Sequence, residues 1–282
     1  MKIIVGLDET GTETQMCNGW CYFGLPEDCF KSFNTESDAI KRKHGISGFH
    51  AKKYKSSEKA AYEEFFLLIE KYIVKCPISI CSTYLYRKDW NKELHDFSER
   101  VFSGATTNAG IENPDATKIA KIFLPPLYTL SAIGKNLCNN FEFDVHFDSD
   151  DLKKQLDDHT LSLTPDIGLS LCKSMAIVAN KYREINYPNS PQILDTMIQV
   201  LDDEKSNIIQ AADVIGNFSN AYIFTTLGGI SKKRKEKSSI FDTAFGKYLT
   251  NVNFLGTIKL HGDNDLELIG DTAASPFILG RC

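Results

Sequence analysis

Apolar and polar positions along the chain follow two periods, one typical of strands and one typical of helices. Short apolar or alternating runs predict strands over 3–7, 20–25, 78–86, 141–147 and 193–201. Apolar positions three and four residues apart predict helices over 57–74, 165–187 and 206–227. One more helix and a weak strand pair over 255–260 and 266–269 are expected in the tail. Strands that alternate with helices in this way favour a mixed α/β fold.

Three segments do not follow either period clearly. The polar segment 27–55 is expected to be an irregular loop, and the basic segment 231–239 a linker. The region 89–140 has helical patterns broken by glycine and prolines, which predicts a helical insertion. No internal repeat or low-complexity tract is present, so residues 1–282 are expected to form one domain that contains this insertion.

Composition and charge limit the possible classes of protein. A chain of 282 residues with 42% hydrophobic and 24% charged residues is long and apolar enough for one large core. The net charge of −5 and the isoelectric point near 5.7 exclude a basic nucleic-acid-binding face over the whole surface, but not local basic patches. There is no run of about 18 apolar residues, and the first apolar run is too short for a signal segment. A cytoplasmic protein with no membrane partner is therefore expected.

The eight cysteines are scattered along the chain without a CxxC pair, and several of them fall in apolar segments. This usage is typical of reduced, buried thiols in a cytosolic protein. It also argues against a zinc site, because no second pair of thiols accompanies Cys17 and Cys21.

One acidic residue stands out within an apolar helical segment. Asp213 is the only charged residue between Lys205 and Lys232. An ionised carboxylate removed from water costs several kcal/mol unless it is paired or bound to a metal ion. Asp8 follows the first apolar strand and Asp148 follows the alternating strand, so two more carboxylates lie at the ends of core strands. Three such groups from distant elements predict a site for a hard cation.

Short motifs in a fixed order extend this prediction. The motifs are Leu7-Asp8-Glu9-Thr10-Gly11, Phe49-His50-Ala51, Phe147-Asp148 and Ile209-Gln210-Ala211-Ala212-Asp213. As a set they resemble the bacterial and phage family called domain of unknown function 3800. The resemblance implies a ribonuclease H-like mixed sheet flanked by helices. It also implies that Asp8, Glu9, Asp148 and Asp213 belong to the site, with His50 beside them.

The resemblance has one departure. Members of the family often carry a glutamate two positions before the histidine, whereas this chain has Gly48 there. A fourth carboxylate at that position is therefore missing, and Glu9 is the candidate substitute.

The chemistry of the predicted site does not depend on the family name. Magnesium and manganese ions prefer oxygen ligands and keep coordination positions for water and phosphate. Two such ions about 4 Å apart stabilise both the attacking and the leaving oxygen of a phosphoryl displacement. Asp8, Asp148 and Asp213 form the minimal set of ligands for Mg²⁺ or Mn²⁺. We therefore expect a metal-dependent nuclease that hydrolyses phosphodiesters in nucleic acid.

His50 and the residues near it complete this hypothesis. An imidazole with an ordinary pKa of about 6.5 can donate to a scissile phosphate or protonate the leaving group. Lys52, Lys53 and Lys55 lie close to His50 in the sequence and are the expected contacts for a nucleic-acid backbone. The basic run 232–237 fits either a second backbone contact or a solvated loop, and we expect the loop.

Each of these residues also has a structural interpretation. Asp8 fits a turn that ends a strand, Asp148 fits a helix cap, and Asp213 fits an ion pair with a distant lysine or arginine. His50 fits a solvated loop histidine. For the whole protein, the alternative function is a non-catalytic recognition or sensor protein of a phage-defence or mobile-element system, with a protein partner. An actin-like or sugar-kinase ATPase is a third hypothesis, disfavoured by the spacing of glycine and threonine after the first strand. The sequence leaves the oligomeric state open.

Overall fold

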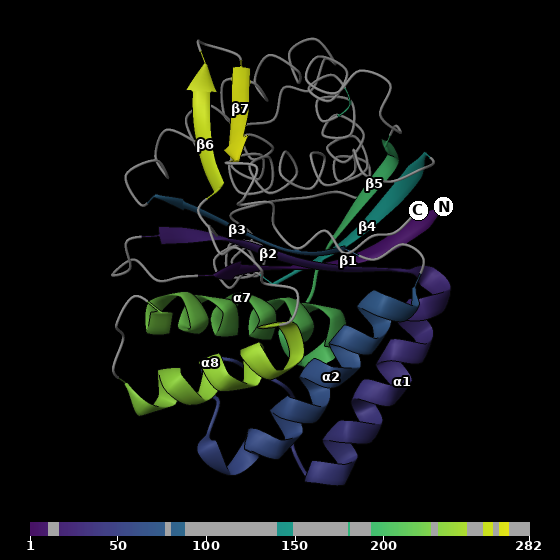
Figure 1. The fold of residues 1–282 in the computed structure, drawn as a ribbon. Coiled ribbons are helices and arrows are strands. Elements are labelled where there is room, and N and C mark those ends of the chain that lie inside the picture. Colours follow the sequence, from purple (N-terminus) through teal and green to yellow (C-terminus); the bar gives the residue numbers. More distant parts are fainter. Residues whose placement is uncertain are drawn as a thin grey trace, which may run out of the picture.

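A mixed five-stranded sheet with helices packed on one face carries the core of the protein (Figure 1). The computed structural model describes residues 1–10, 17–76, 80–87, 140–148, 180, 193–226, 231–246, 256–261 and 265–270. The strands are β1 (Lys2–Thr10), β2 (Cys17–Pro26), β3 (Ile80–Arg87), β4 (Phe141–Phe147), β5 (Ile193–Val200), β6 (Gly256–His261) and β7 (Asp265–Gly270). The helices are α1 (Glu27–His44), α2 (Lys59–Lys75), α7 (Asn207–Thr226) and α8 (Lys232–Phe245), with the short 3-10 helices η1 (Ser56–Glu58) and η3 (Asp203–Lys205). The predicted mixed α/β class is confirmed.

Most predicted elements fall where the apolar patterns place them. The strands predicted over 3–7, 20–25, 78–86, 141–147 and 193–201 correspond to β1, β2, β3, β4 and β5, and the predicted tail pair corresponds to β6 and β7. The helices predicted over 57–74 and 206–227 correspond to α2 and α7. The predicted insertion over 89–140 and the helix over 165–187 lie outside the described residues, apart from single positions at 140 and 180.

The order of the strands brings several carboxyl ends to one edge of the sheet. The order is β3-β2-β1-β4-β5. The pairs β1–β2 and β2–β3 are antiparallel, whereas β4 runs parallel to β1 and β5 runs parallel to β4. Leu7 of β1 lies opposite Phe147 of β4, and Phe147 lies opposite Val200 of β5. The residues that follow these three positions therefore meet at the same edge, as side chains do at the carboxyl ends of parallel strands.

The core lies between the sheet and the helices. Figure 1 shows α1, α2, α7 and α8 on one face of the sheet. Ile4 of β1 belongs to the same buried cluster as apolar side chains from all four helices. The cluster is rich in aromatic rings: Phe49 stacks on Phe65 with ring centroids 3.8 Å apart, and Tyr62 stacks on Phe218 at 5.5 Å. Rings of this size bury the largest apolar area per residue, so they account for much of the stability of this layer.

Gly6 allows α7 to lie directly against β1. A side-chain carbon added at Gly6 would overlap the backbone of Ile208 and Ile209 at the start of α7. Any larger residue would therefore force the helix away from the strand. Asp8 lies two residues beyond Gly6 on the same face of β1, and Asp213 lies further along α7. The glycine thus permits the close approach that brings these two acids together.

The segment predicted as an irregular loop over 27–55 begins instead with a long helix. The buried residues of α1 are Phe33, Ser37 and Ile40. This stripe is narrow and includes a serine, which is why the apolar pattern did not reveal the helix. The residues at the two ends of α1 are typical of a helix. Pro26 precedes a first turn with two acids, the last turn is basic, and Gly45 follows with a left-handed φ of 65°.

The basic segment 231–239, predicted as a linker, is the first part of α8. Ser231 caps this helix, since its hydroxyl accepts a hydrogen bond from the Arg234 N–H at 3.4 Å. Buried side chains in the second half of α8 hold it against the core, namely Ile240, Phe241, Ala244 and Phe245. These apolar residues come after the basic run. The prediction of a linker over 231–239 is therefore wrong, because it separated the basic first half of α8 from the buried second half.

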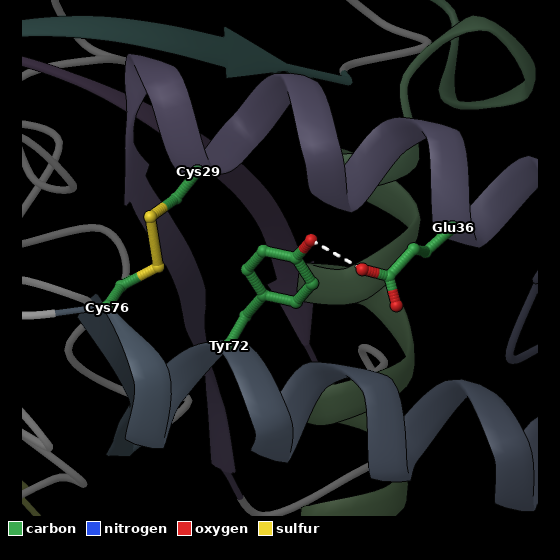
Figure 2. Close-up of a disulfide and its surroundings, with 4 residues drawn as sticks. All are labelled: Cys29, Glu36, Tyr72 and Cys76. Carbon is green, nitrogen blue, oxygen red and sulfur yellow. Dashed lines mark hydrogen bonds between the residues drawn. A yellow bond between two sulfur atoms is a disulfide. The ribbon is translucent and has the colours of Figure 1, made fainter.

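A disulfide joins the first helix to the end of the second. Cys29 in α1 and Cys76 directly after α2 are bonded, with Cα atoms 6.7 Å apart, and Figure 2 shows the bridge near the Tyr72 ring. The Tyr72 hydroxyl donates a hydrogen bond to Glu36 at 2.8 Å, so a second contact links the same two helices. The prediction of reduced thiols is wrong for this pair, because a separation of 47 residues hides a proximity created by the packing of α1 on α2. It holds for the buried thiol of Cys21.

None of the helices in the described part of the chain is both long and apolar enough to cross a lipid bilayer. The predicted cytoplasmic location depended partly on reduced cysteines, and it stays a prediction.

Replacing Gly6 by alanine tests the contact between β1 and α7. The added methyl group overlaps the backbone of α7, so the variant should lose about 3 kcal/mol or more of unfolding free energy, the upper end of the usual cost of overpacking. Urea denaturation followed by circular dichroism measures this loss. The control is Gly45→Ala, which adds a methyl group in open space at a left-handed residue and should cost only about 1 kcal/mol. Wild-type stability in Gly6→Ala would contradict close packing of α7 on β1.

Candidate active site

Asp8 and Asp213 are hydrogen bonded to each other where β1 and α7 meet. The carboxyl O–H of Asp8 donates to the Asp213 carboxylate, and both side chains are partly buried. Asp213 also accepts a hydrogen bond at Oδ2 from the backbone N–H of Ala51, at 2.7 Å. The structure therefore turns the acid of the late helix toward the first strand. Among the residues that the structure describes, its hydrogen-bond partners are an acid and a backbone amide, in place of the lysine or arginine of a structural ion pair.

Burial and like charges raise the pKa of Asp8 well above its ordinary value. The charges responsible, in decreasing order, are those of Asp213, Asp148 and Glu9. Burial also raises the pKa of Asp213, although the Ala51 N–H and the Asp8 O–H both stabilise its ionised form. The two carboxyl groups therefore share one proton, because like charges in contact oppose the second ionisation. A cluster of this kind either holds a proton or takes up a cation.

Asp148 and Glu9 lie at different positions around this pair. Asp148 directly follows β4, and the register of β1 and β4 makes it a neighbour of Asp8 at the edge of the sheet. Its side chain is partly buried, and its charge acts on Asp8. Glu9 is exposed and comes next after Asp8 along β1, so it lies on the opposite face of the strand. The charges of Asp148 and Glu9 thus both act on Asp8, but Asp148 is partly buried at the edge of the sheet whereas Glu9 is exposed on the other face of β1.

The backbone around His50 is held by buried side chains from α2 and α7. The Phe49 N–H donates to Gln210 Oε1 at 3.1 Å. The His50 N–H donates to Tyr62 Oη at 3.0 Å, and the Tyr62 O–H donates to the His50 carbonyl at 2.9 Å. Because these backbone groups are satisfied by core side chains, the loop has a fixed place beside the carboxylates.

Lys237 of α8 is a buried cation that completes this support. Its Nζ donates to the Ala51 carbonyl at 2.8 Å and to Asn217 Oδ1 at 2.6 Å. Burial, with a smaller contribution from the charge of Lys233, lowers the pKa of Lys237 to about 8. The Ala51 peptide therefore lies between Lys237 on one side and Asp213 on the other. Sequence reasoning missed Lys237 because it belongs to a basic run that reads as solvated.

His50 is buried and contacts an acid that the sequence analysis did not identify. Its Nδ1 lies 2.7 Å from Asp203 Oδ2, and the residue is 8% exposed, so it is not a solvated loop histidine. The hydrogen bond to Asp203 raises the pKa of His50 although burial opposes this, and the same contact lowers the pKa of Asp203. Asp203 lies just beyond β5, a third parallel strand at this edge, and that position is the signal that could have found it.

Gln210 and Gly48 shape the space beside His50. Gln210 donates through Nε2 to the Asp203 carbonyl at 2.7 Å, which links the loop to η3. A side-chain carbon at Gly48 would lie 3.0 Å from His50 Nε2 and 3.2 Å from Gln210 Nε2. A glutamate at this position, as in the family that the motifs resemble, would require both neighbours to move. The carboxylate that contacts His50 comes from Asp203 instead.

Three exposed lysines follow the loop directly: Lys52, Lys53 and Lys55. The charge of Lys52 stabilises the ionised form of Asp213, so this lysine lies within electrostatic reach of the carboxylates. Lys53 and Lys55 approach described acidic residues at 3.8 and 3.9 Å. Of the three lysines predicted to contact nucleic acid, Lys52 thus lies near the carboxylate pair.

The carboxylates that the structure describes at this edge offer oxygen donors but do not form a complete metal site. Within the described residues, no three His, Cys, Asp or Glu side chains are arranged as a complete metal site. A shared proton holds Asp8 and Asp213 in direct contact instead. Exchange of that proton for Mg²⁺ or Mn²⁺ would leave Asp8, Asp148 and Asp213 as oxygen ligands, the type that these ions prefer.

Comparison with models of known protein families finds no match to this chain, and comparison with curated proteins finds none either. The resemblance drawn from the short motifs therefore stays a prediction. The case for a function depends on the geometry of the carboxylates and of His50.

Replacing Asp8 by asparagine should stabilise the metal-free protein near neutral pH. Because the pKa of Asp8 is raised in the folded state, the folded protein keeps a proton on Asp8 that the unfolded chain loses above about pH 4. The free energy of unfolding therefore falls as the pH rises from that value through the pKa of Asp8 in the folded state. Asparagine keeps an N–H donor for Asp213 and removes the charge. The unfolding free energy near neutral pH should therefore rise by about 0.5 to 2 kcal/mol.

Urea denaturation in EDTA measures this gain, which should disappear near about pH 3, where Asp8 is protonated in both states. The control is Asp28→Asn, which changes an exposed acid in the first turn of α1 and should not stabilise the protein. A less stable Asp8→Asn variant at neutral pH would contradict the shared proton.

The contact between His50 and Asp203 should stabilise the fold most while both partners carry charge. The raised pKa of His50 makes its contribution complete below about pH 6.5 and lost as the pH rises through the folded value. The lowered pKa of Asp203 makes its contribution present above about pH 3.9 and lost as the pH falls through the folded value. Asp203→Asn should therefore cost about 1 to 2 kcal/mol near pH 5.5 and less near pH 9.

Urea denaturation at the two pH values measures this difference. The neighbouring variant Glu204→Gln changes an exposed acid and should cost little at either pH. Equal losses for Asp203→Asn at both pH values would show that the contact is not an ion pair.

Proposed function

We propose that this protein is a metal-dependent nuclease with a ribonuclease H-like core. The observation that carries the proposal is the contact between Asp8 and Asp213, with Asp148 beside it at the carboxyl edge of parallel strands. Carboxylates gathered from distant elements are what a phosphoryl-transfer site for divalent ions needs. The sheet supports the same class, because it combines three early strands, a parallel strand that leads to a carboxylate and a late helix that carries an acid.

Asp8, Asp148 and Asp213 would hold Mg²⁺ or Mn²⁺. When bound, such an ion acts as a Lewis acid on phosphate oxygens and lowers the pKa of water. The protein itself orients the ligands. The Ala51 N–H fixes Asp213 through Oδ2, and the close packing at Gly6 keeps β1 and α7 together.

His50 is the residue placed to move a proton in this reaction. Its Nδ1 is hydrogen bonded to Asp203, which fixes the ring and leaves Nε2 to donate to the leaving oxygen. The raised pKa of His50 keeps the ring protonated to a higher pH than an ordinary histidine, as a proton donor requires. Asp203 contacts the imidazole directly, so its proposed role is to position the ring.

Cleavage assays test the proposal directly. Purified protein is incubated with labelled single-stranded and double-stranded DNA and RNA in Mg²⁺, Mn²⁺ or EDTA. Wild type should cleave at least one substrate with a metal ion and none in EDTA. Asp213→Asn removes a direct ligand, so it should lower the rate by more than the roughly 10- to 100-fold that is typical of an outer-shell change.

The matched control for this assay is Asp28→Asn, which changes an exposed acid of α1 and should keep wild-type activity. If wild type and Asp213→Asn behave identically on every substrate, the nuclease proposal fails.

A further inference from the structure

Two basic segments that lie far apart in the sequence meet beside the carboxylate site. One lies in the loop before α2, and the other opens α8. Lys233 Nζ donates to the Lys52 carbonyl at 3.4 Å. The Ser56 and Tyr54 hydroxyls both donate to Glu236 Oε2, at 2.5 and 3.4 Å. The first turns of α8 therefore lie directly on the loop.

The two segments form one surface, which we call the basic surface. Its exposed cations are Lys52, Lys53, Lys55, Lys232, Lys233, Arg234 and Lys235. The acids within the same segments are Glu58 and Glu236, and Glu236 is turned toward the loop hydroxyls. The basic surface therefore concentrates positive charge on a protein whose net charge is −5.

The basic run of α1 shows how this protein neutralises lysines elsewhere. Lys41 and Lys43 each lie 2.8 Å from a carboxylate. On the basic surface, Lys53 and Lys55 approach described acids at 3.8 and 3.9 Å, and exposed pairs contribute little even at shorter distances. Acids thus lie closer to Lys41 and Lys43 of α1 than to Lys53 and Lys55 of the basic surface.

The charges at the start of α8 also work against the helix. The amino-terminal end of a helix dipole is positive, so acids in the first turn stabilise a helix and bases destabilise it. Helix α1 follows this rule, because its first turn contains acids and its last turn contains bases. The first turn of α8 contains no acid and begins the run 232–235 of four bases. Helix stability does not account for these cations, whereas a polyanionic partner does.

One peptide connects the basic surface to the carboxylates. The Ala51 N–H binds Asp213, and the next residue, Lys52, belongs to the basic surface. Lys237, two residues beyond the basic run of α8, donates to the Ala51 carbonyl. The basic surface therefore borders the Asp8–Asp213 pair through the Ala51 peptide.

We propose that the basic surface binds the phosphate backbone of a nucleic acid and leads it to the carboxylates of Asp8 and Asp213. The proposal rests on the nuclease function and adds the contact that holds its substrate. Lysines that neutralise phosphates release counterions, so this binding is sensitive to salt and insensitive to base sequence. A nucleic acid fits better than a lipid headgroup because the adjacent carboxylates suit the phosphodiester cleavage proposed above.

Binding is measured without cleavage, using wild-type protein in EDTA. Fluorescent single-stranded RNA, single-stranded DNA and duplex DNA of about 20 nucleotides are titrated from about 50 to about 200 mM salt, with anisotropy as the readout. The test variant carries Lys232→Ser and Lys235→Ser. The control carries Lys31→Ser and Lys75→Ser, the same change in charge at the disulfide end of α1 and α2.

The test variant loses two phosphate contacts, so its slope of log K (the association constant) against log salt should be shallower than that of the wild type by roughly 2. The factor by which its affinity falls between the two salt concentrations should therefore be about tenfold smaller than the factor for the wild type. The control variant should keep the wild-type slope. Equal slopes in the two double variants overturn the proposal, and so does tighter binding to phosphatidylserine vesicles than to any nucleic acid. Lysine-dependent binding without cleavage in Mg²⁺ or Mn²⁺ rejects the nuclease function and leaves the basic surface as a nucleic-acid contact.

Discussion

The contact between two carboxyl groups, one on β1 and one on α7, is the constraint around which the candidate site is built. It exists because Gly6 has no side chain, which lets α7 lie on the strand at the position where Asp8 and Asp213 face each other. Burial and like charge then favour one shared proton over two negative charges. A fold that holds two acids in this way gives up stability, and strongly shifted carboxyls of this kind are typical of functional sites.

The residues around His50 hold it in a fixed position. The loop that carries His50 has its backbone groups bound by side chains of α2, α7 and α8, and the Phe49 ring stacks on Phe65 beneath it. Asp203 then fixes the His50 ring from the end of β5. A loop held in this manner is ordered before a substrate arrives, which lowers the cost of orienting the reacting groups. The basic run of α8 lies on the same loop, so the proposed substrate contact and the proposed chemistry would share one support.

The sheet and the lone charge of α7 could be predicted because both rest on local patterns. Apolar runs identified the five strands, and Asp213 stood out as the only charge in an apolar helix. The helix α1 was missed because its buried stripe is narrow, although its capping residues were visible. The Cys29–Cys76 bridge and the contact of Asp203 with His50 were missed for another reason. Both depend on which elements pack together, which no local pattern specifies.

The central claim is that a divalent cation can replace the proton shared by Asp8 and Asp213. Calorimetric titration of the metal-free protein with Mn²⁺, in buffers of different ionisation enthalpy, measures both the binding and the protons released. The account predicts saturable binding with proton release in the wild type, lost in Asp8→Asn and Asp213→Asn and kept in Glu204→Gln. Absence of saturable binding, or unchanged binding by Asp8→Asn, would contradict it.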